Sequence, residues 1–220
     1  MSPAESPVPA AAPGRPKDAA KHAAIIAAAW GLFRAHGFAD VTMAAVAAAA
    51  GVSKATIYSH FGDKETLFVA VVRWFIQALL TEIGKAGGRD GTLAERLTAV
   101  GRSFLALICR PEVVAADRAL VPTLAANPAL AQLFYQAGPG QMRAALAEAI
   151  AAAAARGELQ VSDATAAADD LFALCCGNLP RLLELGVITA VTEAEIAARV
   201  QHAIAVFLRA YAPAPAASTR

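Results

Sequence analysis

Apolar residues recur along this chain at intervals of three and four, which is the spacing of one face of an α-helix. The longest such pattern lies between residues 64 and 85, where Leu67, Val71, Phe75 and Leu79 form one stripe. Phe68, Val72 and Trp74 widen that stripe, so this helix is expected to pack against partners on two sides. No stretch alternates apolar and polar residues as a half-buried strand would. The pattern predicts an all-α fold.

Capping residues and helix breakers set the limits of the predicted helices. Ser, Thr, Asp and Asn are favoured at helix N-caps, and Gly at C-termini. Thr92 and Thr192 each precede a Glu by three residues, the spacing of a capping box. The helices expected from these signals run over Ala19 to His36, Thr42 to Gly51, Lys54 to Phe61, Lys64 to Lys85, Thr92 to Cys109, a short segment from Pro111, Asn127 to Ala137, Gln141 to Arg156, Asp163 to Leu185 with Ser162 as its cap and a kink near Gly177 and Pro180, and Glu193 to Tyr211.

Glycines at 84, 87, 88 and 91 interrupt the pattern and place a domain boundary near residue 82. We therefore expect a small helical head over 19–79 and a larger helical domain over 82–211. The two ends, 1–17 and 212–220, are rich in Pro and Ala without periodicity, and we expect them to be disordered.

The most informative stretch is Thr42 to Lys64, TMAAVAAAAGVSKATIYSHFGDK. Two short helices meet there at the turn Gly51-Val52-Ser53, a pattern typical of the helix-turn-helix. The second helix shows Lys54, Thr56, Tyr58, Ser59 and His60 on one face. These side chains can donate hydrogen bonds near a helix N-terminus, where an anion is favoured. A short helix of this kind fits the major groove of DNA.

This stretch resembles the tetracycline-repressor (TetR) family of bacterial transcription regulators. The resemblance rests on Thr42, Gly51-Val52-Ser53, Thr56-Ile57-Tyr58, His60-Phe61, Lys64-Glu65 and Leu67-Phe68, and it spans about Ala19 to Leu79. The second half is similar to the AefR-like branch of that family, through ALAQLFYQAGP at 129–139 and ARGEL at 155–159.

The resemblance implies a three-helix DNA-binding head and a C-terminal helical domain for ligand binding and dimerisation. It also implies a regulator of transcription that a small molecule releases from a palindromic operator. The helix after Ser53 becomes the recognition helix, with Lys54, Ala55, Thr56 and Ser59 near base edges and Thr42, Tyr58, His60 and Lys64 on the phosphate backbone. Thr42 and Ser53 also serve as helix caps.

One departure from the family pattern keeps an alternative open. Met43, Ala44 and Ala45 stand where many relatives carry polar residues, so that helix is expected to make few phosphate contacts beyond Thr42. The alternative is a helical ligand-binding protein that has lost DNA binding. Binding to DNA at moderate salt would separate the two.

Charge and composition exclude other classes of protein. The chain has 19 basic and 18 acidic residues, so any basic surface must be local. Its four histidines, at 22, 36, 60 and 202, have no metal-ligand spacing, and neither a phosphate loop nor a nucleophile elbow is present. We expect no enzyme activity, metal or cofactor. No apolar run reaches the 20 residues of a membrane span and no secretory signal is seen, so we expect a cytoplasmic protein.

The cysteines are Cys109, Cys175 and Cys176. Because their number is odd and a cytoplasmic chain is expected, structural disulfides are not expected. We interpret them as buried small apolar residues rather than as a redox switch.

The larger domain is expected to bind an apolar effector and a second copy of the chain. The expected site lies between the helix from Lys64 and the helices from Thr92 to Leu185, and its candidate residues are Trp74, Phe75, Arg102, Phe104, Tyr135, Phe172, Asn178 and Arg181. The last two long helices are expected to form a two-fold interface, because apolar residues occupy more than one face: Leu171, Phe172, Leu174, Leu179, Leu182 and Leu183 on one, and Ile196, Val200, Ile204, Phe207 and Leu208 on the other.

Overall fold

The computed structural model describes residues 16–87 and 91–213, and helices are the regular elements of that part of the chain. The helices are α1 (Pro16–Asp40), α2 (Met43–Ala49), α3 (Lys54–Phe61), α4 (Lys64–Gly87), α5 (Leu93–Ile108), α6 (Pro111–Ala126), α7 (Pro128–Ala137), α8 (Pro139–Ala155), α9 (Ala164–Cys176), α10 (Leu179–Glu184) and α11 (Glu193–Tyr211). The predicted all-α fold is confirmed. The expected tails fall almost entirely outside the described residues.

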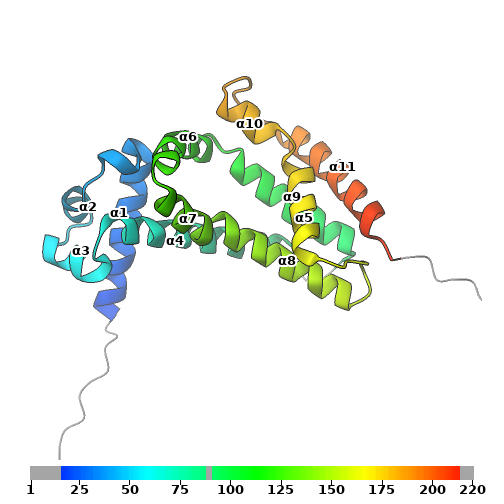
Figure 1. Ribbon diagram of the computed structural model, residues 1–220, viewed down its shortest axis with the longest axis horizontal. Coiled ribbons are helices and arrows are strands. Elements are labelled where there is room, and N and C mark those ends of the chain that lie inside the picture. The colour runs from blue at the N-terminus through cyan, green and yellow to red at the C-terminus, as the bar shows by residue number, and fades with distance from the viewer. Residues whose placement is uncertain (1–15, 88–90, 214–220) are drawn as a thin grey trace, which may run out of the picture.

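The helices form an arch (Figure 1). Helices α1, α2 and α3 make the head at one end, and α5, α9 and α11 pack together at the other. Helix α4 runs from the head along the lower side of the arch and packs against α5 and α7. Helix α6 crosses above it and contacts both α1 and α10. The head therefore meets the rest of the molecule mainly through α4 and α6, and Leu130 of α7 also joins the head cluster. The predicted boundary near residue 82 lies inside α4.

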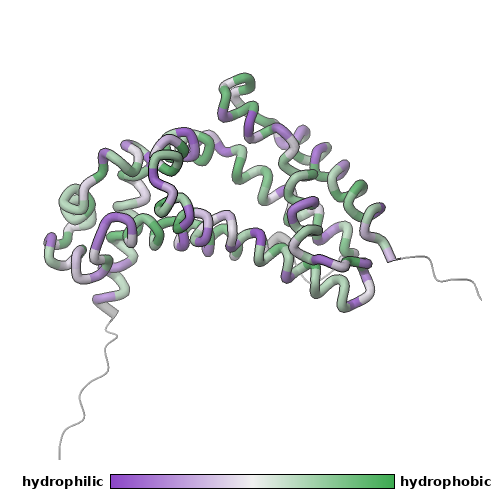
Figure 2. The backbone as a smooth tube through the Cα atoms, viewed as in Figure 1, coloured by the Kyte–Doolittle hydropathy of each residue, from purple (hydrophilic) through white to green (hydrophobic). Residues whose placement is uncertain are grey.

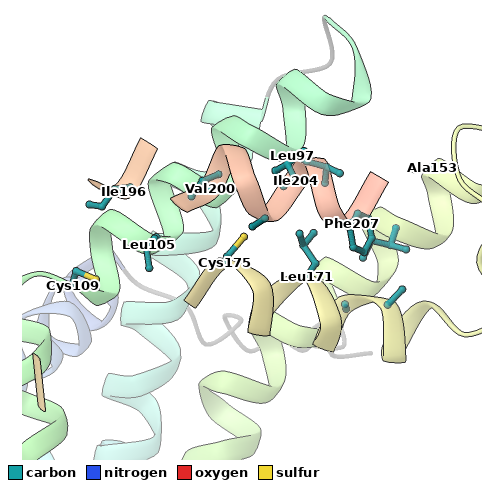
Figure 3. Close-up of a cluster of buried hydrophobic side chains, with 14 of the residues drawn as sticks. Leu97, Leu105, Cys109, Ala153, Leu171, Cys175, Ile196, Val200, Ile204 and Phe207 are labelled. Atoms are coloured by element: carbon teal, nitrogen blue, oxygen red, sulfur yellow. The ribbon is translucent and has the colours of Figure 1, made fainter. Parts of the chain in front are cut away.

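Three apolar clusters hold these parts together. The head cluster gathers Ile25, Val46, Ile57, Phe61 and Leu67 between α1, α2, α3 and α4. A middle cluster joins the end of α4 to α5. The largest lies among α5, α8, α9 and α11, where Figure 3 shows Leu171 and Cys175 facing Val200, Ile204 and Phe207. Apolar positions also follow α4 and α5 through the arch in Figure 2.

Local signals in the sequence explain most of the helix ends. Thr92 and Thr192 each form a complete capping box with Glu95 and Glu195. Gly37 has a φ of 76°, a left-handed value that breaks the helical conformation inside α1, and the rings of Phe33 and Phe38 then meet across it at 5.7 Å.

The structure corrects two expectations for the C-terminal helices. The segment from Asp163 to Leu185 is two helices rather than one kinked helix, because Gly177 has φ 51° and ψ −127° and ends α9. Asp163, not Ser162, is the N-cap of α9, and its carboxylate accepts from the backbone N–H groups of Thr165 and Ala166.

The apolar residues named on the two faces of the C-terminal helices mostly fill the protomer's own core, so they are not free to contact a partner. Leu171, Leu183, Ile196, Val200, Ile204 and Phe207 lie in that core, while Leu174, Leu179 and Leu208 pack against it. Phe172 is partly exposed and faces a cavity described below.

Candidate DNA-binding surface and cavity

The turn between α2 and α3 is built by caps on both sides. The Thr42 hydroxyl accepts from the backbone N–H of Ala45 at 3.1 Å, and Ser53 accepts from Thr56 at the same distance. Gly51 has a φ of 66° and makes the left-handed step that ends α2. Val52 then donates its backbone N–H to Ala47 at 3.0 Å, which closes the turn. These bonds hold α3 at a fixed angle to α2.

Helix α3 presents a polar face to solvent. Ile57 and Phe61 are buried, whereas Lys54, Ala55, Tyr58 and Ser59 are exposed. Tyr58 is 52% exposed, far more than a core tyrosine would be. No acidic residue lies within α3, so its N-terminal half combines Lys54 with free backbone N–H groups. This surface suits an anionic partner such as a DNA backbone.

Thr56 makes hydrogen bonds to two of its neighbours on α3 and its N-cap. Its hydroxyl lies 2.9 Å from that of Ser53, and its carbonyl accepts from the Ser59 hydroxyl at 2.8 Å. The hydroxyls of Ser53 and Thr56 therefore bond to each other, and the Ser59 hydroxyl bonds to the α3 backbone.

His60 turns away from that face toward α1. Its Nε2 lies 3.0 Å from the Asp18 carboxylate, and its side chain is only 14% exposed. The His22 ring packs on Phe61 with centroids 5.0 Å apart, beside His60. His60 therefore ties the end of α3 to the start of α1.

Lys64 is held inside the head by backbone carbonyls. Its ammonium donates to the carbonyls of Phe38, Ala39 and Val41 at 2.8, 3.1 and 3.0 Å, and lies 4.4 Å from the centre of the Phe38 ring. An ammonium has three N–H donors, and all three are used here. Thr42, Ser53, Lys54, Ala55, Thr56, Tyr58 and Ser59 remain available at the surface, whereas His60 and Lys64 have partners within the protein.

A cavity of about 530 Å³ lies between the head and the C-terminal helices. Its walls come from α1, from the middle of α4, and from α5, α6, α9 and α10, with contributions from α7 and α8. Eight aromatic side chains line it: Trp30, Phe33, Phe38, Phe68, Phe75, Phe104, Phe134 and Phe172. Trp30 of the head stacks on Phe75 of α4 with centroids 4.7 Å apart. A mostly apolar cavity of this size is typical of a small-molecule site.

Four of the eight predicted pocket residues line this cavity: Phe75, Phe104, Phe172 and Arg181. The other four lie outside its lining. Trp74 is 46% exposed on α4, and Tyr135 bonds to Arg143 at the surface. Arg102 pairs with Glu193 at 2.9 Å, and Asn178 is exposed between α9 and α10.

The sequence interpretation missed the polar wall of the cavity. Asp117 of α6 lines it, as do Glu184 and Arg181 of α10. Burial, and secondly the charge of Glu184, raises the pKa of the Asp117 carboxyl to about 6. The available signal was its position: Asp117 falls on the same face of α6 as Val113, Val114 and Leu120. It also missed Trp30 and Arg34, which bring α1 into the wall.

The three cysteines are buried free thiols, as predicted. Burial raises the pKa of Cys175 to about 11 and that of Cys176 to about 12. Burial also raises the pKa of Cys109. The thiolate is the reactive form, so thiols of this kind are inert at neutral pH.

Two family profiles match the chain. The profile for bacterial regulatory proteins of the tetR family matches residues 25–71, and the profile for the C-terminal domain of AefR-like transcriptional repressors matches residues 95–213. The chain belongs to the TetR family of transcriptional regulators. This confirms the family resemblance seen in both halves of the sequence.

Individual relatives agree. The flavonoid-responsive regulator FrrA is 33% identical in its solved structure, with a TM-score of 0.75 over 89% of this chain and 98% of FrrA. A structure from Mesorhizobium loti assigned to the TetR family is 26% identical, with a TM-score of 0.78 over 90% of this chain and all of that one. The curated regulator BetI of Brucella anthropi is 39% identical over 64 residues, which cover 29% of this chain and only 33% of BetI.

Within the described residues, no group of side chains has the composition of a metal site. None of the helices in that part of the chain is long and apolar enough to cross a bilayer.

Proposed function

We propose that this TetR-family regulator is a cytoplasmic repressor that binds a palindromic operator as a homodimer and leaves it when a small, largely apolar molecule fills the cavity. One observation carries this proposal. The cavity wall includes Trp30, Phe33 and Phe38 of α1, so a ligand would contact the DNA-binding head itself. We propose no catalytic role.

Helix α3 is the proposed reading element. Lys54 and Ala55 open it, and Tyr58 and Ser59 follow one turn later on the same exposed face. A two-fold dimer would present two copies of α3 to major grooves about 34–36 Å apart, or a multiple of that distance. Lys54 and Thr56 are the residues that we assign to base edges, and Thr42 and Tyr58 those that we assign to phosphates.

Selection of bound sequences from a random DNA pool tests this assignment. We expect a near-palindrome for the unmodified chain, and altered base preference for Lys54→Ala and Thr56→Ala, by roughly 1–3 kcal/mol at one position of each half-site. Arg110→Ala is the matched control, because it removes one exposed positive charge far from α3. Unchanged preference in both α3 variants would refute the assignment. Absence of binding at moderate salt would favour the ligand-binding protein without DNA binding.

The proposed dimer interface is the outer side of α9 and α11. These two helices pack together, and their outward positions carry exposed small or polar residues, Ala166 and Ala173 on α9 and Ala198, His202 and Ala205 on α11. Small side chains let helices of two subunits approach closely in a four-helix arrangement. Light scattering at micromolar concentration should give the mass of a dimer, and Ala205→Glu should shift it toward the monomer. Ala151→Glu, on the exposed side of α8, is the control.

Release of the operator would follow from a shift of one DNA-binding head relative to the head of the other subunit. A ligand between α4, α6 and α10 would move α4 and the contact of α6 with α1. Such couplings typically amount to about 1–3 kcal/mol and are reciprocal. Calorimetric titration of a ligand should therefore give weaker binding in the presence of operator DNA, and equal affinities would refute control by that ligand.

A further inference from the structure

Asp117 is a carboxylate without a partner on the wall of an apolar cavity. Among the described residues it makes no hydrogen bond or ion pair, and burial and Glu184 are the two influences on its charge. Asp117 is only partly exposed to solvent, and removing a carboxylate from water without a compensating group is costly.

None of the cations that line or adjoin the cavity pairs with Asp117. Arg181 lines the cavity, but its Nη1 bonds to the Glu184 carboxylate at 3.1 Å. Arg118, the next residue on α6, donates to the backbone carbonyl of Leu183 and fastens α6 to α10. Arg34 is an exposed residue of α1 on the head side of the lining. A neighbouring cation would lower the pKa of the Asp117 carboxyl, and none of these three arginines does so.

The aromatic part of the cavity wall also favours a positive charge. The eight aromatic residues named above present π-faces, which attract cations, and the Trp30–Phe75 stack is among them. An anionic ligand near Asp117 would face that carboxylate and Glu184, whose charge Arg181 balances in part, while Arg34 is the cation on the head side of the lining. An uncharged ligand would leave the Asp117 carboxylate without a counter-charge.

We propose that the effector is an apolar, largely aromatic molecule carrying one basic nitrogen, and that its cationic group pairs with Asp117. This rests on the proposed function, because it assumes that the cavity is the effector site. The apolar part of the effector would lie against the aromatic walls, and its ammonium would pair with the Asp117 carboxylate, which has no cationic partner among the described residues. The Asp117 carboxylate is then both a selective contact for cations and a barrier to apolar acids.

A matched set of probes tests the preference for charge. Phenylbutylamine, phenylbutanol and phenylbutanoate share one apolar skeleton and differ in charge at neutral pH. Binding to the full chain is followed by calorimetry and by quenching of Trp30, which lines the cavity. We expect the amine to bind roughly tenfold or more tightly than the alcohol, and the acid to bind most weakly.

Two variants locate the effect. Asp117→Asn keeps the shape of the side chain and should bring the amine and the alcohol to within about twofold of each other. Glu112→Gln removes an equal charge from an exposed position on the same helix and should leave the order of the probes unchanged. Thermal unfolding of each variant shows that it is folded before its affinities are compared.

The outcomes separate this proposal from the proposed function. Equal or tighter binding of the alcohol or the acid to the unmodified chain, failure of all three probes to bind, or an unchanged preference in Asp117→Asn overturns the cation site. Release of operator DNA is measured in parallel by fluorescence anisotropy. If the amine binds with the expected preference but leaves DNA affinity unchanged, the cation site stands and effector control through this cavity fails.

Discussion

Replacing Lys64 with Met should destabilise the DNA-binding head rather than simply remove a phosphate contact. The Lys64 ammonium bonds to three carbonyls at the end of α1 and in the segment that leads to α2. Methionine keeps an unbranched apolar stem against the Phe38 ring but has no donor. The variant therefore isolates the ammonium.

The size of the effect follows from these bonds. Two of them, to Phe38 and Val41, are partly buried, and the third, to Ala39, is exposed, so its carbonyl can bond to water instead. Hydrogen bonds to a charged group contribute about 1.5–3 kcal/mol each. Two bonds at the lower value give a loss of about 3 kcal/mol in the free energy of unfolding of the head.

Urea unfolding, combined with hydrogen exchange of the α2 and α3 amides, measures this loss. Lys54→Met is the matched control, since Lys54 is exposed on the same head and its loss should change stability by no more than about 0.5 kcal/mol. DNA binding over a range of salt concentrations separates the two roles of Lys64. Suppose that Lys64→Met keeps the stability of the unmodified chain and lowers by about one the slope of log DNA affinity against log salt concentration. Lys64 would then contact a phosphate, and a stabilising role for its three bonds to carbonyls would be refuted.

Three further predictions concern stability. The pKa of Asp117 is raised from 3.8 to about 6 in the folded chain, so the folded state loses stability as the pH rises from about 4 through 6 and the carboxyl ionises. Asp117→Asn should therefore have a free energy of unfolding up to about 3 kcal/mol above that of the unmodified chain at pH 8. Near pH 4 this difference should vanish, as urea unfolding at both pH values would show. Gly177→Ala should lower the melting temperature, because φ is 51° there and an added Cβ would meet the Arg199 guanidinium. Leu105→Ala should cost about 2–5 kcal/mol in calorimetry, since Leu105 is fully buried between α5 and its neighbours.

The sequence by itself determined most of the helices and the family. Caps such as Thr42 and Thr92 act through bonds to backbone groups within three residues, so their effect can be read locally. The turn at Gly51 and the apolar stripes of α3 and α4 are local for the same reason, and they predicted the helix-turn-helix and the all-α class.

Only the tertiary structure decided how side chains distant in sequence meet. Lys64 and the carbonyl of Phe38 are 26 residues apart, and nothing near Lys64 in the sequence indicates that its ammonium turns inward. Asp117 and Glu184 face one cavity because α6 and α10 pack together, a contact that helical periodicity cannot predict. The periodicity of α11 showed which residues are apolar, but burial of Val200 and Phe207 depended on the packing of α5 and α9 around them. Packing between separate helices therefore set the chemistry of the cavity and decided which apolar residues fill the protomer's own core.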